Sequence, residues 1–194
     1  AMYEPVGLPS TESFVRLPSD EEIRAAIGRQ LSALVEREVG AKILEIRRIV
    51  EQRGQDVRLL NRIGVLYAQY GLFDRAAEEF RQILEHGDYA PALTNLGNIE
   101  FLFERYDTAL ELYERARRVA PRDAPALLGV ARVCYELEFY DRSETAFDLL
   151  RGADPDLAER YAYLDLRGRD SLRAADQTEM RGAVEWVSEN RGDM

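Results

Sequence analysis

The chain has 194 residues, which suits one domain or one repeat array with flanking pieces. Its formal net charge is −10, and this balance opposes binding to nucleic acid or to an anionic membrane surface, because both require clustered positive charge. The single Cys excludes an internal disulfide, and no apolar run approaches the roughly 18 residues of a membrane span. Ala1-Met2 has the form of a cloning remnant, so a leader or anchor ahead of Tyr3 is not excluded. The compartment, cytoplasmic or periplasmic, therefore stays open.

Residues 1–19 are expected to form an extended N-terminal arm. Pro5, Pro9 and Pro18 exclude helix and favour extended backbone. An arm of this kind can dock into a groove of its own chain or of a neighbouring copy and hold the place of a ligand.

Residues 20–55 are predicted to be helical and amphipathic. Ser19 and Glu22 have the spacing of a capping box at the start of the helix. Apolar residues then recur every three or four positions and make one stripe, which also suits pairing with a second copy. The stripe consists of Ile23, Ile27, Leu31, Val35, Val39, Ile43, Ile46 and Val50. Gly40 leaves two alternatives, one long helix or a hairpin that acts as a degenerate repeat, and the hairpin is slightly preferred.

Residues 56–157 contain three copies of one pattern. An aromatic residue followed by Asp recurs at positions 73, 106 and 140, in steps of 33 and then 34 residues, and a fixed period of this size predicts stacked helix hairpins. Each copy also has two small residues and one large aromatic residue in register. These are Gly64, Ala76 and Phe80; Gly97, Ala109 and Tyr113; and Ala131, Ser143 and Phe147.

Helix ends are marked around these copies. Gly87, Pro121 and Pro155 are expected to end the second helix of each pair. Asp88 and Asp123 stand where N-caps are needed, ahead of prolines at 91 and 125 that suit the first helical turn.

Residues 158–194 are expected to form two capping helices, because a repeat array needs ends that differ from its middle. Leu157, Tyr161 and Leu164 give the apolar face of the first. The second is predicted from a capping-box spacing between Asp176 and Glu179. Its apolar face would hold Met180, Val184 and Val187, beside Trp186.

The three copies resemble the tetratricopeptide repeat, in which small residues allow close helix packing and the large residue fills the gap to the next hairpin. The resemblance covers residues 57 to about 157. It implies an all-α fold, a right-handed superhelix of stacked antiparallel helix hairpins. It further implies that the first helix of each pair lines a concave groove, and that the protein is a non-catalytic scaffold for a protein or peptide partner.

Projection of the first helices places a mixed polar and aromatic set on the concave side. An Asn amide donates and accepts at once, which suits the main chain of an extended peptide, while Arg can bind a carboxylate and an aromatic ring can anchor an apolar side chain. The predicted groove residues are Arg58, Asn61, Arg62, Asn95, Asn98, Phe101, Arg132 and Tyr135.

Some members of the family grip the C-terminal carboxylate of a chaperone peptide, and this chain departs from their pattern. Asn95 stands at the middle Asn position of that clamp. Val65, Pro125 and Gly129 occupy positions that need polar or basic groups. A receptor for chaperone tails is therefore not expected.

No catalytic, metal or cofactor site is expected. One His cannot build a multi-His metal site, the glycines at 28, 40 and 54 form no phosphate-binding loop, and paired carboxylates fall on predicted exposed helix faces. Two alternatives to the scaffold stay open. One is a self-assembling structural protein that pairs through its N-terminal helix, and the other is a carrier of an apolar small ligand beside residues 101–103.

Overall fold

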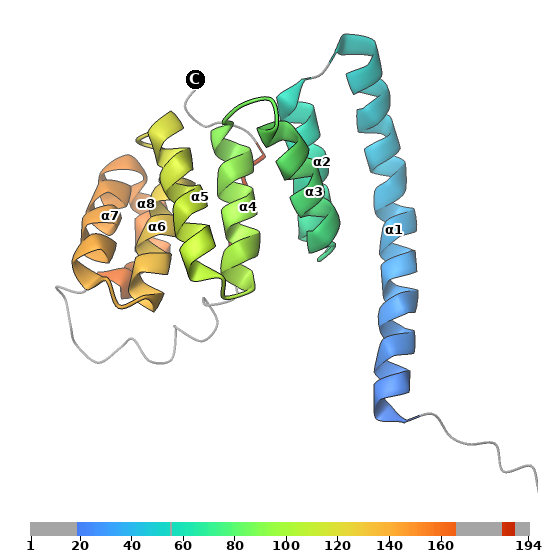
Figure 1. The fold of residues 1–194 in the computed structure, drawn as a ribbon, viewed down its shortest axis with the longest axis horizontal. Coiled ribbons are helices and arrows are strands. Elements are labelled where there is room, and N and C mark those ends of the chain that lie inside the picture. Colours follow the sequence, from blue (N-terminus) through green and yellow to red (C-terminus); the bar gives the residue numbers. More distant parts are fainter. Residues whose placement is uncertain (1–18, 55, 166–183, 189–194) are drawn as a thin grey trace, which may run out of the picture. The chain divides into compact units, whose positions relative to one another are not determined.

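The computed structural model describes residues 19–54, 56–165 and 184–188, and every structural statement below concerns these residues. The protein divides into two compact units, residues 1–37 and residues 38–194. The described residues form helices and no strand, and none of these helices has both the length and the apolar character of a membrane span. The helices are α1 (Asp20–Arg53), α2 (Val57–Gln69), α3 (Phe73–Leu84), α4 (Ala90–Leu102), α5 (Tyr106–Val119), α6 (Ala124–Glu136), α7 (Tyr140–Ala153) and α8 (Pro155–Arg160), followed by a 3₁₀ turn at Ala162–Leu164 (Figure 1).

Helix α1 begins with the capping box that the sequence predicted. The Ser19 amide donates to Glu22 Oε2 at 2.7 Å, and the Glu22 amide donates to Ser19 Oγ at 3.2 Å. The preferred hairpin break at Gly40 is wrong, because α1 is one helix from Asp20 to Arg53. A glycine inside a helix costs only about 1 kcal/mol relative to alanine, and the helix-forming residues around Gly40 outweigh that cost. On the C-terminal side of Gly40, Ile43 and Ile46 are buried.

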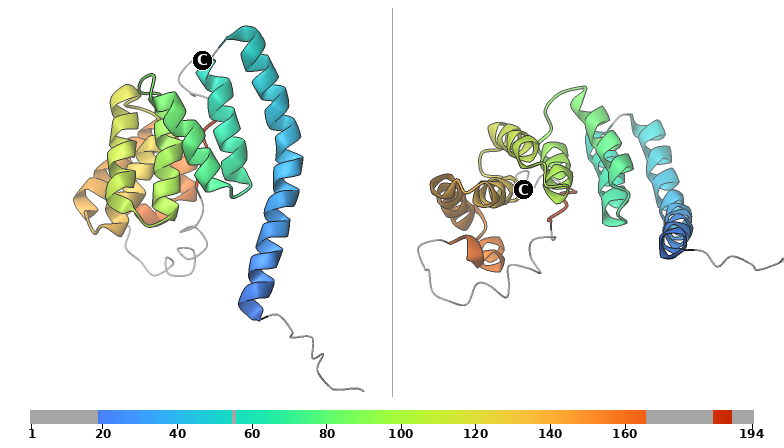
Figure 2. Two further views of the ribbon diagram at one scale, coloured as in Figure 1. Left: turned by 45° about the vertical axis from the view of Figure 1, so that its right-hand side comes forward. Right: turned by 60° about the horizontal axis from the view of Figure 1, so that its bottom comes forward.

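Helices α2 to α7 form three antiparallel hairpins, α2/α3, α4/α5 and α6/α7, which confirms the predicted repeat array. The first helices of successive pairs are neighbours, since α4 contacts both α2 and α6 (Figures 1 and 2). The turn inside each hairpin has one residue with a left-handed backbone. These residues are Gly71, Glu104 and Glu138, with φ of 75°, 57° and 60°, and they repeat the steps of 33 and 34 residues.

The small and large residues of the pattern pack on one another. A Cβ atom on Gly64 would overlap Cε1 of Phe80, so that ring rests directly on the backbone of α2. The Tyr113 ring lies between two backbones, because a Cβ atom on Gly97 in α4 would lie 2.8 Å from it and one on Gly129 in α6 would lie 2.5 Å from it. Glycine is therefore required at these three positions, where the ring lies too close for a Cβ atom.

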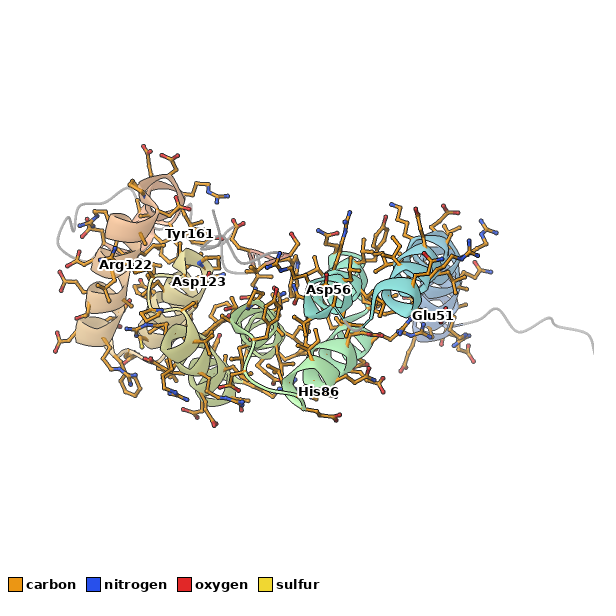
Figure 3. All side chains as sticks on the ribbon, turned by 90° about the horizontal axis from the view of Figure 1, so that it is seen from above. Glu51, Asp56, His86, Arg122, Asp123 and Tyr161 are labelled. Atoms are coloured by element: carbon orange, nitrogen blue, oxygen red, sulfur yellow. The ribbon has the colours of Figure 1, made fainter. Side chains whose placement is uncertain are left out.

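Only one of the two predicted Asp caps is present. Asp123 precedes α6, and its carboxylate accepts from the Ala126 amide at 3.1 Å (Figure 3). The cap expected at Asp88 is wrong, because α4 begins one residue later with Tyr89 at the N-cap position and no side-chain cap. Asp88 instead accepts from Arg115 Nη2 at 2.6 Å.

The two aspartates make a matched test of these capping assignments. Asp123→Ala is expected to lower the free energy of unfolding by about 1 kcal/mol, because the first turn of α6 loses its side-chain acceptor. Asp88→Ala removes a partly exposed ion pair and is expected to cost at most about 0.5 kcal/mol. Urea denaturation of both variants measures the difference, and equal losses would contradict the assignment.

The C-terminal region differs from the expected pair of capping helices. Leu157 lies in the short helix α8, and Tyr161 and Leu164 are also buried, so the first expected apolar face is present. Residues 184–188 are not helical, and the second helix is wrong over this range. Its expected capping box, Asp176 and Glu179, lies outside the described residues, as does Met180.

Candidate functional site

The non-helical segment 184–188 lies against the first helices of the hairpins. We call the surface that it contacts the inner face, which is formed by α2, α4 and neighbouring side chains of α3, α6 and α8. The segment is the short red piece near α4 in Figures 1 and 2. Three side chains, the Asn triad of Asn61, Asn95 and Asn98, hold it by its main chain.

The main chain of Val187 is held at both of its polar atoms. Its amide donates to Asn95 Oδ1 at 2.7 Å, and its carbonyl accepts from Asn95 Nδ2 at 2.7 Å and from Asn61 Nδ2 at 2.8 Å. Val187 is 6% exposed, and Asn61 and Asn95 are fully buried. Because buried main-chain groups need hydrogen-bond partners, one asparagine amide replaces here what a neighbouring strand supplies in a sheet.

The orientation of each asparagine amide is fixed by a second contact. Asn95 Nδ2 also donates to Asn61 Oδ1 at 3.1 Å, which leaves Asn61 Nδ2 to face the carbonyls of residues 187 and 188. The Tyr113 hydroxyl donates to Asn98 Oδ1 at 2.7 Å, which leaves Asn98 Nδ2 to donate to the Glu185 carbonyl at 2.8 Å. Burial raises the pKa of Tyr113 well above its ordinary value, so the hydroxyl keeps its proton. The triad is thus oriented to receive a main chain.

The side chains of the segment have separate surroundings. Trp186 stacks on Phe73 of α3, with ring centroids 6.2 Å apart and an interplanar angle of 29°. Glu185 forms an ion pair with Arg160 of α8 at 2.9 Å. A pocket of about 220 Å³ adjoins residues 185–188 and is lined on the helix side by Pro125, Leu157 and Arg160.

The other predicted groove residues have different surroundings. Arg58 and Arg62 are exposed on α2, and Tyr135 is half-buried against Tyr140 and Tyr163. Phe101, one of the residues proposed beside an apolar ligand, is 5% exposed.

Arg132 lies inside the protein rather than on an open surface. It is 4% exposed, and its guanidinium carbon is 4.3 Å from the ring centroid of Phe101 and 5.4 Å from that of Tyr161. Arg132 also hydrogen-bonds Tyr163, which opposes the rise that burial produces in the pKa of that tyrosine. A ligand carboxylate could reach this guanidinium only if the surrounding side chains moved, because Arg132 is buried.

Sequence reasoning did not find the contacts of Phe73, Arg160 and Trp186. Phe73 was used only as a mark of the repeat, and Trp186 was placed beside a helix. The expected docking of residues 3–18 lies outside the described residues.

The described residues show no cluster suited to a metal ion. No group of three or more His, Cys, Asp or Glu side chains among them is arranged to hold a metal. Cys134 is fully buried, and burial raises the pKa of its thiol, which lowers its reactivity.

Stacked hairpins whose inner face holds a chain segment by its main chain define a helical-repeat scaffold of the α-solenoid class. Residues 101–166 match the family model described as tetratricopeptide repeat. The matched stretch is a tetratricopeptide repeat, and the described residues have the fold of this repeat, a right-handed superhelix of stacked antiparallel hairpins.

Known proteins share this fold. A structure titled MamA RS-1 ArsTM double mutant is 18% identical, with a TM-score of 0.56, and the match covers 79% of this chain and 91% of that one. A tetratricopeptide repeat protein from Parabacteroides merdae is also 18% identical, with a TM-score of 0.55 over 85% of this chain and 72% of that one. Among curated proteins, the protein CTR9 homolog of Arabidopsis thaliana is 34% identical over 114 residues, which are 56% of this chain and 10% of that protein. The chain therefore spans about a tenth of the length of that relative.

Proposed function

We propose that the protein is a non-catalytic scaffold that binds an extended segment of a partner protein on its inner face. The observation that carries the proposal is the pair of hydrogen bonds, each 2.7 Å, between the Asn95 amide and the main chain of Val187. Every peptide presents the same main-chain donor and acceptor, so a site that holds one segment in this way is chemically suited to hold another. The repeat fold supports a protein partner in general.

The predicted groove arginines are part of this proposal. Arg58 and Arg62 are exposed on α2, the helix that carries Asn61. We assign them a short-range role, the binding of a carboxylate of the partner segment, because the net charge of −10 opposes attraction of an acidic partner from a distance.

Joint replacement of Asn61, Asn95 and Asn98 by alanine tests this proposal. Crosslinked co-purification from native cells is expected to recover the partner with the unchanged protein and at least tenfold less of it with the triple variant. Gln82→Ala is the matched control, because Gln82 carries the same kind of amide on an exposed position of α3. Equal recovery with all three proteins would overturn the proposal.

A second candidate function is self-assembly through α1. Three large apolar side chains on the N-terminal half of this helix are exposed, Ile23 by 42%, Ile27 by 58% and Leu34 by 48%. Exposed apolar residues on one helix suit pairing with a second copy. In sedimentation at tens of micromolar, the unchanged protein would then be larger than a monomer, and I23E/I27E would be monomeric. A monomeric unchanged protein would remove this candidate.

A further inference from the structure

The inner face already has an occupant from the same chain. Residues 185–187, Glu-Trp-Val, place three different side chains in three different surroundings while the Asn triad holds their main chain. Main-chain contacts select no sequence, whereas side-chain contacts do. The occupant therefore shows which side chains the site accepts at each position.

We propose that the partner segment carries the same succession, an acidic residue, an aromatic residue and a β-branched aliphatic residue, and that residues 185–187 are an internal copy of this ligand which the partner displaces. This inference rests on the proposed function and adds its sequence preference and its built-in competitor.

The aliphatic position is the most restrictive. Val187 is 6% exposed and is held at its amide and its carbonyl by buried asparagines. A charged residue here would lose its hydration without gaining a partner. A glycine has no side chain to bury, so the favourable free energy of burying apolar surface would be lost. This position is expected to govern affinity, as a buried anchor does at other interfaces.

The other two positions add graded preferences. The ring of Trp186 stacks on that of Phe73, a contact that tyrosine or phenylalanine can also make. The carboxylate of Glu185 is paired with Arg160, whose side chain is 56% exposed, so this ion pair is screened by water and salt. Loss of the aromatic ring should therefore weaken binding more than loss of the charge.

The internal copy can compete with a partner segment for the inner face and can also be displaced by it. A tethered segment acts at an effective concentration on the order of millimolar, so a free peptide must overcome that competition. The pocket of about 220 Å³ beside residues 185–188 is space that the internal copy leaves open. A partner segment that fills this pocket gains contacts that the internal copy lacks, and this gain supports displacement.

The single Trp of the chain reports this displacement directly, because it is residue 186 itself. The first experiment titrates the full chain with the blocked peptide Val-Glu-Phe-Val-Ser, which contains no Trp, and follows Trp emission. We expect the emission to shift to longer wavelength as Trp186 leaves Phe73 for water. The same peptide with Asp in place of its second Val is the control and should give no shift.

The second experiment frees the site with the full-chain variant V187D and measures a dye-labelled Val-Glu-Trp-Val-Ser peptide by anisotropy. Binding to V187D is expected to be at least tenfold tighter than to the unchanged chain, and to be lost in V187D/N95A. Peptide variants should rank in one order, with the second Val→Asp losing at least a hundredfold, Trp→Ala about tenfold and Glu→Gln about threefold. Circular dichroism of V187D shows whether the helices remain.

Each contrary outcome has a separate meaning. If all peptides bind equally and binding needs Asn95, the sequence preference is overturned and the proposed scaffold function stands. If the labelled peptide binds the unchanged chain and V187D equally, residues 185–187 do not compete. If no peptide binds either chain, the inference is overturned as a whole, while co-purification with the triple Asn variant still decides the proposed function.

Discussion

Gly129→Ala is expected to lower the free energy of unfolding by about 3 kcal/mol, at the upper end for one added methyl group in a packed core. A Cβ atom on this residue would lie 2.5 Å from two ring atoms of Tyr113 and 2.6 Å from a third. The ring is held in place, because it also lies against the backbone of Gly97 and its hydroxyl is bound to Asn98. The added carbon must therefore separate α4 from α6, and chemical denaturation with circular dichroism measures the loss.

Two further changes isolate the steric cause. Gly40→Ala adds the same carbon inside α1, where no atom other than the nearby backbone of α1 itself lies within 4 Å, and is expected to stabilise the helix by about 0.5 to 1 kcal/mol. Tyr113→Leu removes the obstructing ring. Its combination with Gly129→Ala should therefore cost less than the sum of the two single changes. Additive losses would show that the ring is not the obstacle.

The hairpins could be predicted from the sequence because their main contacts repeat within each copy. Phe80 contacts Gly64 and Tyr113 contacts Gly97. Both pairs are sixteen positions apart, so the two contacting residues have the same sequence separation in each copy. The family resemblance also implied that the large residue of each copy fills the gap to the next hairpin, and the contact of Tyr113 with Gly129 is of this kind. The glycine itself was not predicted as the partner of the ring, because the other copies have no glycine at the corresponding position.

The candidate site was only half predictable. Helix periodicity put Asn61, Asn95 and Asn98 on one side of the first helices, and the match of an Asn amide to a peptide main chain suggested the kind of ligand. The occupant could not be predicted, because its hydrogen bonds join residues that are 87 to 127 positions apart, and no repeated pattern in the sequence marks these pairs. Val184 and Val187 also have helical spacing, and so short a run fits a helix and a non-helical segment equally well.

The location of Arg132 shows a second limit of predicting a helix's exposed side chains from its periodicity. Arg132 is on the first helix of its hairpin, as Arg62 is, and both were predicted to line the groove. Arg62 is exposed, whereas Arg132 is covered by the rings of Phe101 and Tyr161. A periodicity gives the direction of a side chain from its own helix, but it does not show which residues of the next element will cover it.

Arg132→Ala is expected to lower the free energy of unfolding by about 3 to 5 kcal/mol, as the removal of other large buried side chains does. The change leaves a cavity, removes cation–π contacts worth about 1 kcal/mol or more each, and takes a partner from the Tyr163 hydroxyl. Arg62→Ala removes the same kind of side chain from an exposed position and should change stability by less than about 0.5 kcal/mol. Urea denaturation of both variants makes the comparison.

Arg132→Lys separates the charge from the shape of the guanidinium. A lysine keeps the positive charge but lacks the planar group that lies against Phe101, so a loss of about 1 to 2 kcal/mol is expected, between those of the other two variants. If the alanine variant were as stable as the unchanged protein and bound the Val-Glu-Trp-Val-Ser peptide less well, Arg132 would be a ligand contact and the buried assignment would be wrong. If stability falls in the order Arg, Lys, Ala, the guanidinium serves the core that holds α6 against α4 and the C-terminal turn.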